Sequence, residues 1–273
     1  ARHGVAAQLN RRARRPRDRA TGGDQVEGRR AVRELLRAGR RRARQVWIAD
    51  DTAPAAVLDD IVDLAADRGV PLRRVPGAHL ASAARTDAPQ GVLAFADPLP
   101  EADVDELLRD PHAFLVVLDG VTDPHNVGSI LRSAEGAGAT GAVLPRHRAA
   151  GLGPTVAKAS AGAIEHVPVA RVGGIPATLE RASRAGVWTV GLDGGADDEL
   201  FALDLGDRPI ALVLGSEGRG LSRLAAARCD VRVRIPMRGA VESLNVSVAA
   251  ALACYEVARK RDTEPEVGFE PTT

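Results

Sequence analysis

Aromatic residues are scarce in this sequence, with seven among 273 residues. An RNA-binding domain that stacks bases on several exposed aromatic side chains is therefore disfavoured, and any RNA would be recognised through arginine contacts and shape. Cysteine is scarcer still, because Cys229 and Cys254 are the only two. They form no CxxC pair and are too few for a disulfide framework, so we expect a reducing, cytoplasmic compartment.

Long apolar runs and metal-ligand patterns are also lacking. No stretch reaches the roughly 18 apolar residues of a membrane span, and the basic first residues are not followed by the apolar segment of a secretory signal. The six histidines show no metal-ligand spacing, and no G-x-S-x-G nucleophile motif occurs. We therefore expect no membrane partner and no bound metal.

Arginine carries nearly all of the positive charge, because Lys158 and Lys260 are the only lysines. The net charge of +1 conceals an asymmetry: residues 1–45 hold 15 arginines and four acidic residues, whereas the rest holds 22 basic and 32 acidic residues. A basic end on an acidic protein indicates a polyanionic partner. Arginine forks onto phosphate and stacks on bases, which favours RNA. Codon bias is the alternative explanation.

The first part of the chain is predicted to form a small α/β domain behind a basic arm. Residues 1–23 have no apolar periodicity and are predicted to be disordered. Residues 24–97 alternate helix and strand patterns. The expected elements are a helical stripe with Val26, Val32, Leu35 and Leu36, strands at 45–49, 71–75 and 91–95, and a helix at 55–68. An acidic, Pro-bounded linker with a short helix is expected at 98–111.

Residues 112–261 are predicted to form a second domain, whose strands are apolar almost throughout. Such runs fit a parallel sheet that is buried on both faces. The expected strands are 113–118, 141–144, 187–192, 210–214 and 231–235, and the expected helices are 126–138, 154–162, 176–185, 219–227 and 243–260. Residues 262–273 are predicted to be a frayed tail.

Three loops follow strands of this predicted sheet, and ligands bind beyond the carboxyl ends of parallel strands. The first loop is DGVTDPHNVGS at 119–129. The second, GSEGRG at 215–220, has glycines that allow close backbone approach to a ligand, but it lacks the phosphate-loop lysine. A plain tight turn is its alternative. The third, at 239–245, brings Glu242, Ser243 and Asn245 to a helix start, where an ordinary N-cap is the alternative.

The helix after the first loop carries a candidate arginine. Its expected buried stripe is Val127, Ile130, Leu131 and Ala134. Arg132 points off this stripe, and Gly128, one turn earlier on the same face, is interpreted as leaving room for a ligand beside the guanidinium group. A solvated surface charge is the alternative for Arg132.

Taken together, the three loops resemble the motifs of the SpoU/TrmH family of SPOUT RNA methyltransferases. The matching segments are DGVTDPHNVGSILRSAEGAGATGAVLP, LVLGSEGRGLS and IPMRGAVESLNVSVAAALACYE, and the resemblance covers about residues 112–260. In the front domain, VEGRRAVRELL resembles the ribosomal-protein-like RNA-binding domain of the rRNA-modifying branch. The branch that matches best methylates a guanosine of bacterial 23S rRNA on its ribose 2′-hydroxyl.

The resemblance implies a parallel sheet with a C-terminal trefoil knot, S-adenosylmethionine as the cofactor, RNA as the substrate and a homodimer. The residues implied to bind the cofactor are Leu192, Gly194, Leu214, Gly215, Ile235, Met237, Ser243 and Leu244. Those implied to form the reaction site are Asn126, Arg132, Glu217, Ser243 and Asn245.

The implied reaction is methylation of a ribose 2′-hydroxyl, for which the site must stabilise a developing oxyanion. A guanidinium with a pKa above about 12 is a poor base, so Arg132 is predicted to polarise the hydroxyl and clamp the adjacent phosphate. Asn126 and Ser243 are predicted to orient the ribose and Asn245 to shape the loop, while Glu217 is open between a structural and a direct role. The alternative functions are a tRNA ribose methyltransferase and a non-catalytic RNA-binding ribosome-assembly protein.

Overall fold

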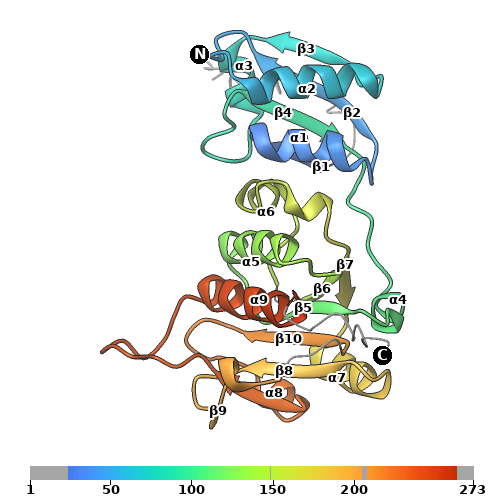
Figure 1. The fold of residues 1–273 in the computed structure, drawn as a ribbon. Helices are drawn as coiled ribbons and strands as arrows, with labels where there is room; N and C mark the ends of the chain where they lie inside the picture. The colour runs from blue at the N-terminus through green and yellow to red at the C-terminus, as the bar shows by residue number, and fades with distance from the viewer. Residues whose placement is uncertain (1–23, 148, 205–207, 263–273) are drawn as a thin grey trace, which may run out of the picture.

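The protein is described by a computed structural model of residues 24–147, 149–204 and 208–262 (Figure 1). The predicted basic arm at 1–23 and all but the first residue of the predicted tail lie outside the described residues. Two α/β units follow one another along the chain, as the sequence predicts. Within the described residues, no helix combines the length and apolarity needed to cross a membrane.

The front domain is a four-stranded sheet with the order β1-β4-β2-β3, in which β4 runs antiparallel to β1 and β2, and β3 runs parallel to β2. Its strands are β1 (Asp24–Glu27), β2 (Ala43–Ala49), β3 (Leu72–Val75) and β4 (Val92–Ala96). Helices α1 (Arg29–Ala38) and α2 (Ala56–Asp67) pack on one face, and α3 (Gly77–Ala83) on the other.

Strand β1 corrects the expected helical stripe, because Val26 lies in this strand and pairs with Ala94. The sequence DQVE does not look like a buried strand, yet Gln25 is 5% and Glu27 0% exposed. The Glu27 carboxylate accepts hydrogen bonds from Gln25 Nε2 at 2.8 Å and, from a distant part of the sequence, the Arg85 amide at 2.6 Å and the Thr86 amide at 3.0 Å. Buried polar groups of this kind are invisible to a hydrophobicity pattern.

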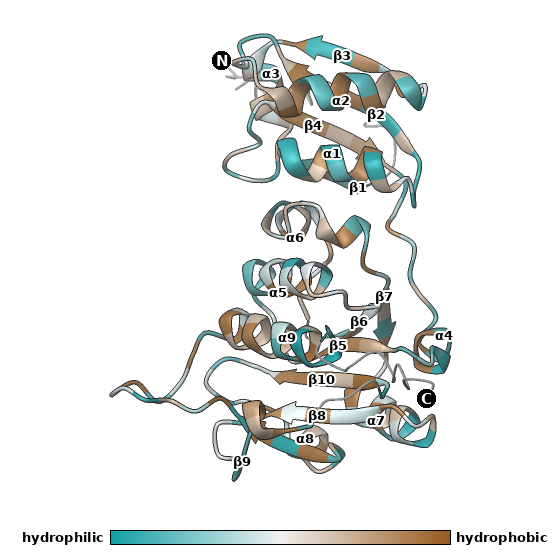
Figure 2. Cartoon of the chain, in the orientation of Figure 1, coloured by the Kyte–Doolittle hydropathy of each residue, from teal (hydrophilic) through white to brown (hydrophobic). Residues whose placement is uncertain are grey.

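The second domain is built on a seven-stranded sheet with the order β7-β6-β5-β10-β8-β11-β9, and all its pairs are parallel. Its strands are β5 (Phe114–Asp119), β6 (Gly141–Pro145), β7 (Val169–Val172), β8 (Trp188–Leu192), β9 (Asp198–Glu199), β10 (Ile210–Gly215) and β11 (Val231–Arg234). The sequence missed β7 and β9, which are short and carry charged residues. Figure 2 shows hydrophobic residues along the central strands β5 and β10.

Helices cover both faces of this sheet, and alternate residues of each central strand pack against opposite layers. One layer contains α5 (Pro124–Gly136), α6 (Pro154–Ala159) and α9 (Val246–Asp262). The other contains α4 (Val104–Arg109) from the linker, α7 (Ile175–Arg184) and α8 (Arg223–Ala226). Short 3-10 helices lie at Ala163–Glu165 and Leu200–Ala202. The expected burial of the sheet on both faces is therefore confirmed.

The front domain lies against the helical layer that contains α5 and α6 (Figure 1). Arg41 of the front domain makes a bidentate ion pair with Glu165, with Nη2–Oε1 at 2.5 Å and Nε–Oε2 at 2.9 Å. Their side chains are 5% and 1% exposed. Removing one partner of such a buried pair leaves an uncompensated charge, at a cost of about 3–5 kcal/mol. Gly162 permits this approach, because a Cβ there would lie 2.5 Å from Glu34 Cβ.

Candidate active site

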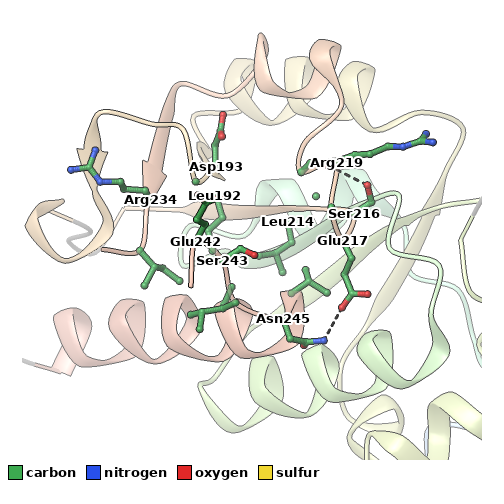
Figure 3. Close-up of a pocket in the computed structure, with 18 of the residues that line it drawn as sticks. Leu192, Asp193, Leu214, Ser216, Glu217, Arg219, Arg234, Glu242, Ser243 and Asn245 are labelled. Carbon is green, nitrogen blue, oxygen red and sulfur yellow. Dashed lines mark hydrogen bonds between the residues drawn. The ribbon is translucent and has the colours of Figure 1, made fainter. Parts of the chain in front are cut away.

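Four neighbouring strands, β5, β10, β8 and β11, end at the same edge of the sheet because they run parallel. The loops that follow β8, β10 and β11 surround a cavity of about 580 Å³, which we call the cofactor cavity (Figure 3). All eight residues predicted to bind a cofactor line it: Leu192, Gly194, Leu214, Gly215, Ile235, Met237, Ser243 and Leu244. Their roles stay predictions, but the expectation that separate loops share one site is met by the geometry.

A hydrogen-bonded cluster at the edge of the cofactor cavity joins the three predicted loops. Glu217 Oε1 accepts a hydrogen bond from Asn126 Nδ2 at 2.9 Å and from Asn245 Nδ2 at 2.7 Å. Asn245 Nδ2 also lies 3.2 Å from Asn126 Oδ1. Two amides fixed on one carboxylate oxygen form a preorganised polar site, and Figure 3 shows the contact between Glu217 and Asn245.

Local capping holds the two asparagines in place. Asp123 is the N-cap of α5: its carboxylate accepts from the His125 amide at 2.9 Å, and Pro124 follows at the first helical position. Asn245 stands directly before α9, which begins at Val246 rather than at the predicted 243. Its Oδ1 accepts from the Ser247 amide at 2.8 Å. Asn245 can therefore be both the N-cap and a member of the site, because its Oδ1 accepts from the helix while its Nδ2 donates to Glu217.

The glycine-rich loop has an internal reason for its glycines. A Cβ on Gly215 would lie 2.0 Å from the carbonyl carbon of Gly220 and 2.2 Å from the Leu221 nitrogen. Ser216 and Gly220 exchange two backbone hydrogen bonds, at 3.0 and 2.9 Å, which close the loop on itself. The predicted close backbone approach therefore occurs within the loop itself, between Gly215 and the Gly220–Leu221 segment. Its effect is to present Glu217 at the tip of the loop.

Arg132 does not join this cluster. It is exposed and lines a second cavity, beside Lys158 and the first turns of α1. The interpretation of Gly128 as room for a ligand is wrong: a Cβ there would lie 2.5 Å from Ala159 Cβ and 2.9 Å from the Ser160 nitrogen. Gly128 instead lets α5 and α6 cross at close range. Asn126, Glu217, Ser243 and Asn245 therefore adjoin the cofactor cavity, whereas Arg132 lies apart within the chain.

Several lining residues were missed by the sequence analysis as site residues. Asp193 follows β8 directly, and its position beyond a strand end could have identified it. Glu242, Val246 and Ala249 also line the cofactor cavity. Arg234 points away from its centre (Figure 3) and binds the carbonyl oxygen of Ala196 at 2.7 Å, so it serves the neighbouring loop.

Neither cysteine offers a nucleophile. Burial raises the pKa of the Cys254 thiol to about 12. Burial, followed by the charge of Asp230, raises the pKa of the Cys229 thiol to about 12. Both thiols are therefore protonated near neutral pH, and a thiolate mechanism is excluded there. Within residues 24–147, 149–204 and 208–262, no group of three histidine, cysteine or acidic side chains could hold a metal ion.

Comparisons with known families match both domains. Residues 113–255 match the SpoU rRNA methylase family, and residues 25–102 match the substrate-binding domain of RNA 2′-O ribose methyltransferases. The chain belongs to the SpoU family of RNA methyltransferases. The family and the α/β fold class predicted from the three loops are therefore confirmed, while the trefoil knot stays a prediction.

Individual relatives of this SpoU methyltransferase extend over both domains. A Bacillus subtilis protein assigned to the TrmH family of tRNA/rRNA methyltransferases is 43% identical over 88% of this chain and 96% of its own. The 23S rRNA (guanosine-2′-O-)-methyltransferase RlmB of Pseudomonas putida is 36% identical over 88% of this chain and 98% of its own. The crystal structure of AviRb from Streptomyces viridochromogenes in complex with AdoMet has a TM-score of 0.73 at 27% identity, over 88% and 91% of the two chains.

Proposed function

We propose that this SpoU methyltransferase transfers a methyl group from S-adenosylmethionine to the 2′-hydroxyl of a guanosine in 23S rRNA. The observation that carries the proposal is the Asn126–Glu217–Asn245 cluster beside the cofactor cavity. The front domain and the relative RlmB, which shares 36% identity along almost its whole length, support rRNA as the substrate.

The cofactor cavity fits S-adenosylmethionine by size and chemistry. Its volume of about 580 Å³ lies in the usual range for small-molecule sites, about 300–1,000 Å³. Apolar side chains at the strand ends, including Leu192, Leu214 and Ile235, offer a wall for the adenine ring. Asp193, Glu217 and Glu242 supply negative charge for a cation. When bound, S-adenosylmethionine supplies an electrophilic methyl group on a positively charged sulfur.

The residues of the cluster orient the ribose. Glu217 Oε1 is held by two amides, whereas Glu217 Oε2 makes no hydrogen bond with any described residue. Oε2 is therefore available to accept a hydrogen bond from the target hydroxyl, which makes the hydroxyl oxygen more nucleophilic. Ser243, in the same cavity, is placed to contact the ribose. Arg132 acts from the neighbouring cavity, where a cation can hold the adjacent phosphate.

Two observations weigh against the alternative functions. The 23S rRNA enzyme RlmB matches 88% of this chain, which favours rRNA over tRNA, and the front domain is joined to the catalytic domain by the buried Arg41–Glu165 pair. A non-catalytic assembly protein has no need for a preorganised cluster at a cofactor cavity, yet the two asparagines and Glu217 are intact.

The methyl-transfer experiment incubates the full chain with labelled S-adenosylmethionine and, separately, a 23S rRNA transcript and total tRNA. We expect label in the 23S transcript only, on the ribose of one guanosine located by alkaline hydrolysis mapping. Glu217→Ala serves as the low-activity control. Label in tRNA with none in the 23S transcript contradicts the proposed substrate, and no label in any RNA contradicts the proposed reaction.

A homodimer accompanies this function, and α9 is its proposed contact. Val248, Leu252 and Tyr255 lie at positions i, i+4 and i+7 of α9 and are 48%, 40% and 54% exposed. This spacing places them on one helical face, and the first turns of α9 are hydrophobic in Figure 2. A second copy of the chain would cover this face in a symmetric contact.

Sedimentation velocity tests the homodimer. Leu252→Asp, which puts a charge on the α9 face, is expected to shift the protein from dimer to monomer. Val62→Asp is the matched control, because Val62 is 38% exposed on the front domain. A monomeric parent protein, or a Leu252→Asp variant that stays dimeric, contradicts the proposed contact.

A further inference from the structure

A second cavity, of about 800 Å³, lies where the front domain meets the methyltransferase domain. We call it the interdomain cavity. Five basic side chains line it: Arg29, Arg30 and Arg33 from α1, Arg132 from α5, and Lys158 from α6. Neither domain alone supplies the full set, so the cavity exists only because the two domains are docked.

The positive charge of the interdomain cavity is only partly compensated. Arg33 is paired with Glu34 at 2.9 Å and with Asp60 at 3.5 Å. The only carboxylate among its lining residues is that of Glu27, which is 0% exposed and already accepts hydrogen bonds from Gln25, Arg85 and Thr86. Arg30 and Arg132 make no hydrogen bond or ion pair with any described residue. Like charges gathered in this way repel one another unless an anion lies between them.

The start of α1 adds to this field. Gly28 is its N-cap and has no side chain, and the first turn contains no acidic residue. The Arg29 amide donates to Gln90 Oε1 at 3.1 Å. Gly28, Arg29, Arg30 and Ala31 all line the interdomain cavity, so the first amide groups of α1 lie at its wall. The positive end of the helix dipole, with no acidic residue in the first turn to offset it, favours an anion at this position.

Backbone strain is concentrated at the same place. Within the part of the chain that the structure describes, only two non-glycine residues have a positive φ: Gln90 at 57° and Ala161 at 51°. Both line the interdomain cavity. Gln90 positions an arginine there, because its carbonyl oxygen accepts from Arg29 Nε at 3.1 Å and its side-chain oxygen accepts from the Arg29 amide at 3.1 Å. Strain of this kind persists where surrounding contacts enforce it, often at binding sites.

The ligand chemistry follows from what lines the cavity. No aromatic side chain is among its lining residues, and the apolar side chains there are the small Ala31, Val57 and Ala161, so there is no surface on which a base could stack. We propose that the interdomain cavity binds a backbone phosphate of the substrate RNA, shared between Arg30 of the front domain and Arg132 and Lys158 of the methyltransferase domain. This inference rests on RNA being the substrate, as proposed above.

The site connects RNA binding with the active site through one helix. Arg132 follows Asn126 by six residues on α5, a rise of about 9 Å. A phosphate held at Arg132 therefore fixes the RNA backbone relative to the Asn126–Glu217–Asn245 cluster. Because Arg30 must reach the same phosphate, RNA binding also favours the docked arrangement of the two domains.

The first experiment measures filter binding of a 23S rRNA transcript to the full chain over a series of salt concentrations. Arg30→Gln is expected to lower the affinity about tenfold and to reduce the slope of log K against log salt by about 0.7–0.9. Arg73→Gln is the matched control, because Arg73 is an exposed arginine of β3 outside the cavity lining. Equal slopes for parent and Arg30→Gln overturn the proposal.

A double-mutant cycle tests whether the phosphate is shared. Arg30→Gln and Lys158→Gln come from different domains, and for one shared phosphate the double variant should lose less affinity than the product of the two single losses. Losses that simply multiply overturn the shared site. Cofactor affinity, measured by calorimetry, should be the same in all four proteins, and equal melting temperatures exclude misfolding.

Inorganic tripolyphosphate separates an RNA phosphate from a free phosphate. It should raise the melting temperature of the parent more than that of Arg30→Gln and compete with the transcript for the parent. Thermal protection without competition would mean that the cavity holds a free phosphate, which overturns the RNA assignment. If the parent methylates no RNA but Arg30→Gln loses affinity as stated, the proposed function fails and the phosphate site stands.

Discussion

The two cavities at α5 differ in the charge and shape of their linings. The cofactor cavity has apolar strand ends and the carboxylates of Asp193, Glu217 and Glu242, which suit a small cation with an aromatic ring. The interdomain cavity has five basic side chains, of which Arg33 is ion-paired, and no accessible carboxylate among its lining residues, which suits a polyanion. The same helix supplies Asn126 to the first site and Arg132 to the second. We therefore expect the methyl donor and the RNA phosphate to bind in separate cavities, with α5 contributing to both sites.

The largest expected effect is that of removing the Arg132 side chain, which should lower turnover without changing cofactor affinity. Arg132→Ala should reduce turnover by about 10²-fold, as for the loss of a group that holds the substrate in its reactive position. Affinity for S-adenosylmethionine should not change, because Arg132 lies outside the cofactor cavity. Single-turnover kinetics and calorimetry measure the two quantities. Glu135→Ala, at an exposed neighbour on α5, is the control. Weakened cofactor binding in Arg132→Ala would contradict the separation of the two cavities.

The converse change affects the cofactor cavity alone. Gly215→Ala should lower S-adenosylmethionine affinity by about 5- to 100-fold, because a Cβ 2.0 Å from the Gly220 carbonyl carbon forces the loop to shift. RNA affinity should be retained. Gly173→Ala is the matched control, since a Cβ there meets nothing within 4 Å. Unchanged cofactor affinity in Gly215→Ala would show that the loop tolerates displacement.

A third change tests the close crossing of α5 and α6. Gly128→Ala should lower the free energy of unfolding by about 1–3 kcal/mol, because its Cβ overlaps Ala159 and the Ser160 backbone of α6. Gly136→Ala, near the end of the same helix, is the control: its Cβ meets only the Tyr255 hydroxyl at 3.0 Å, the far end of a side chain. Urea denaturation measures both variants, and equal losses would contradict the crossing.

The smallest expected effect concerns the docking of the domains in acid. Burial alone would raise the pKa of Glu34, but hydrogen bonds from His166 and Arg33 and the charges of Arg33 and Arg37 outweigh it and lower the pKa below 4.5. A lowered folded-state pKa stabilises the fold above the unfolded value, and this contribution is lost as the pH falls through the folded value.

Glu34→Gln should therefore destabilise the protein by up to about 1 kcal/mol at neutral pH. The difference from the parent should shrink as the pH falls below 4.5. Urea denaturation at a series of pH values measures it. Asp60→Gln is the control, since Asp60 makes only a 3.5 Å contact with Arg33 at the surface. A difference that grows in acid would have the wrong sign for this explanation.

Much of the fold was predictable because apolar strand runs mark a sheet buried on both faces. The five predicted strands of the second domain are all present, and all eight predicted cofactor residues line one cavity. The misses have a common cause. Strand β1 buries Gln25 and Glu27 through hydrogen bonds, and β9 is held by pairing with β11 through Asp198 and Glu199. Polar residues stabilised by partners distant in sequence leave no periodic signal.

The sequence by itself determined the apolar strands, the loops that follow them and the helix caps, since apolar periodicity and capping are local properties. The sheet decided that Asn126, Glu217 and Asn245 meet, because 91 positions separate Asn126 from Glu217 and 28 separate Glu217 from Asn245. Only the tertiary structure decided where Arg132 lies and why Gly128 is glycine. Gly128 depends on the packing of α6 against α5 within one domain, whereas the surroundings of Arg132 include α1, which packing between the domains brings there. The interdomain cavity exists for the same reason: its cations come from three helices that only the docked domains bring together.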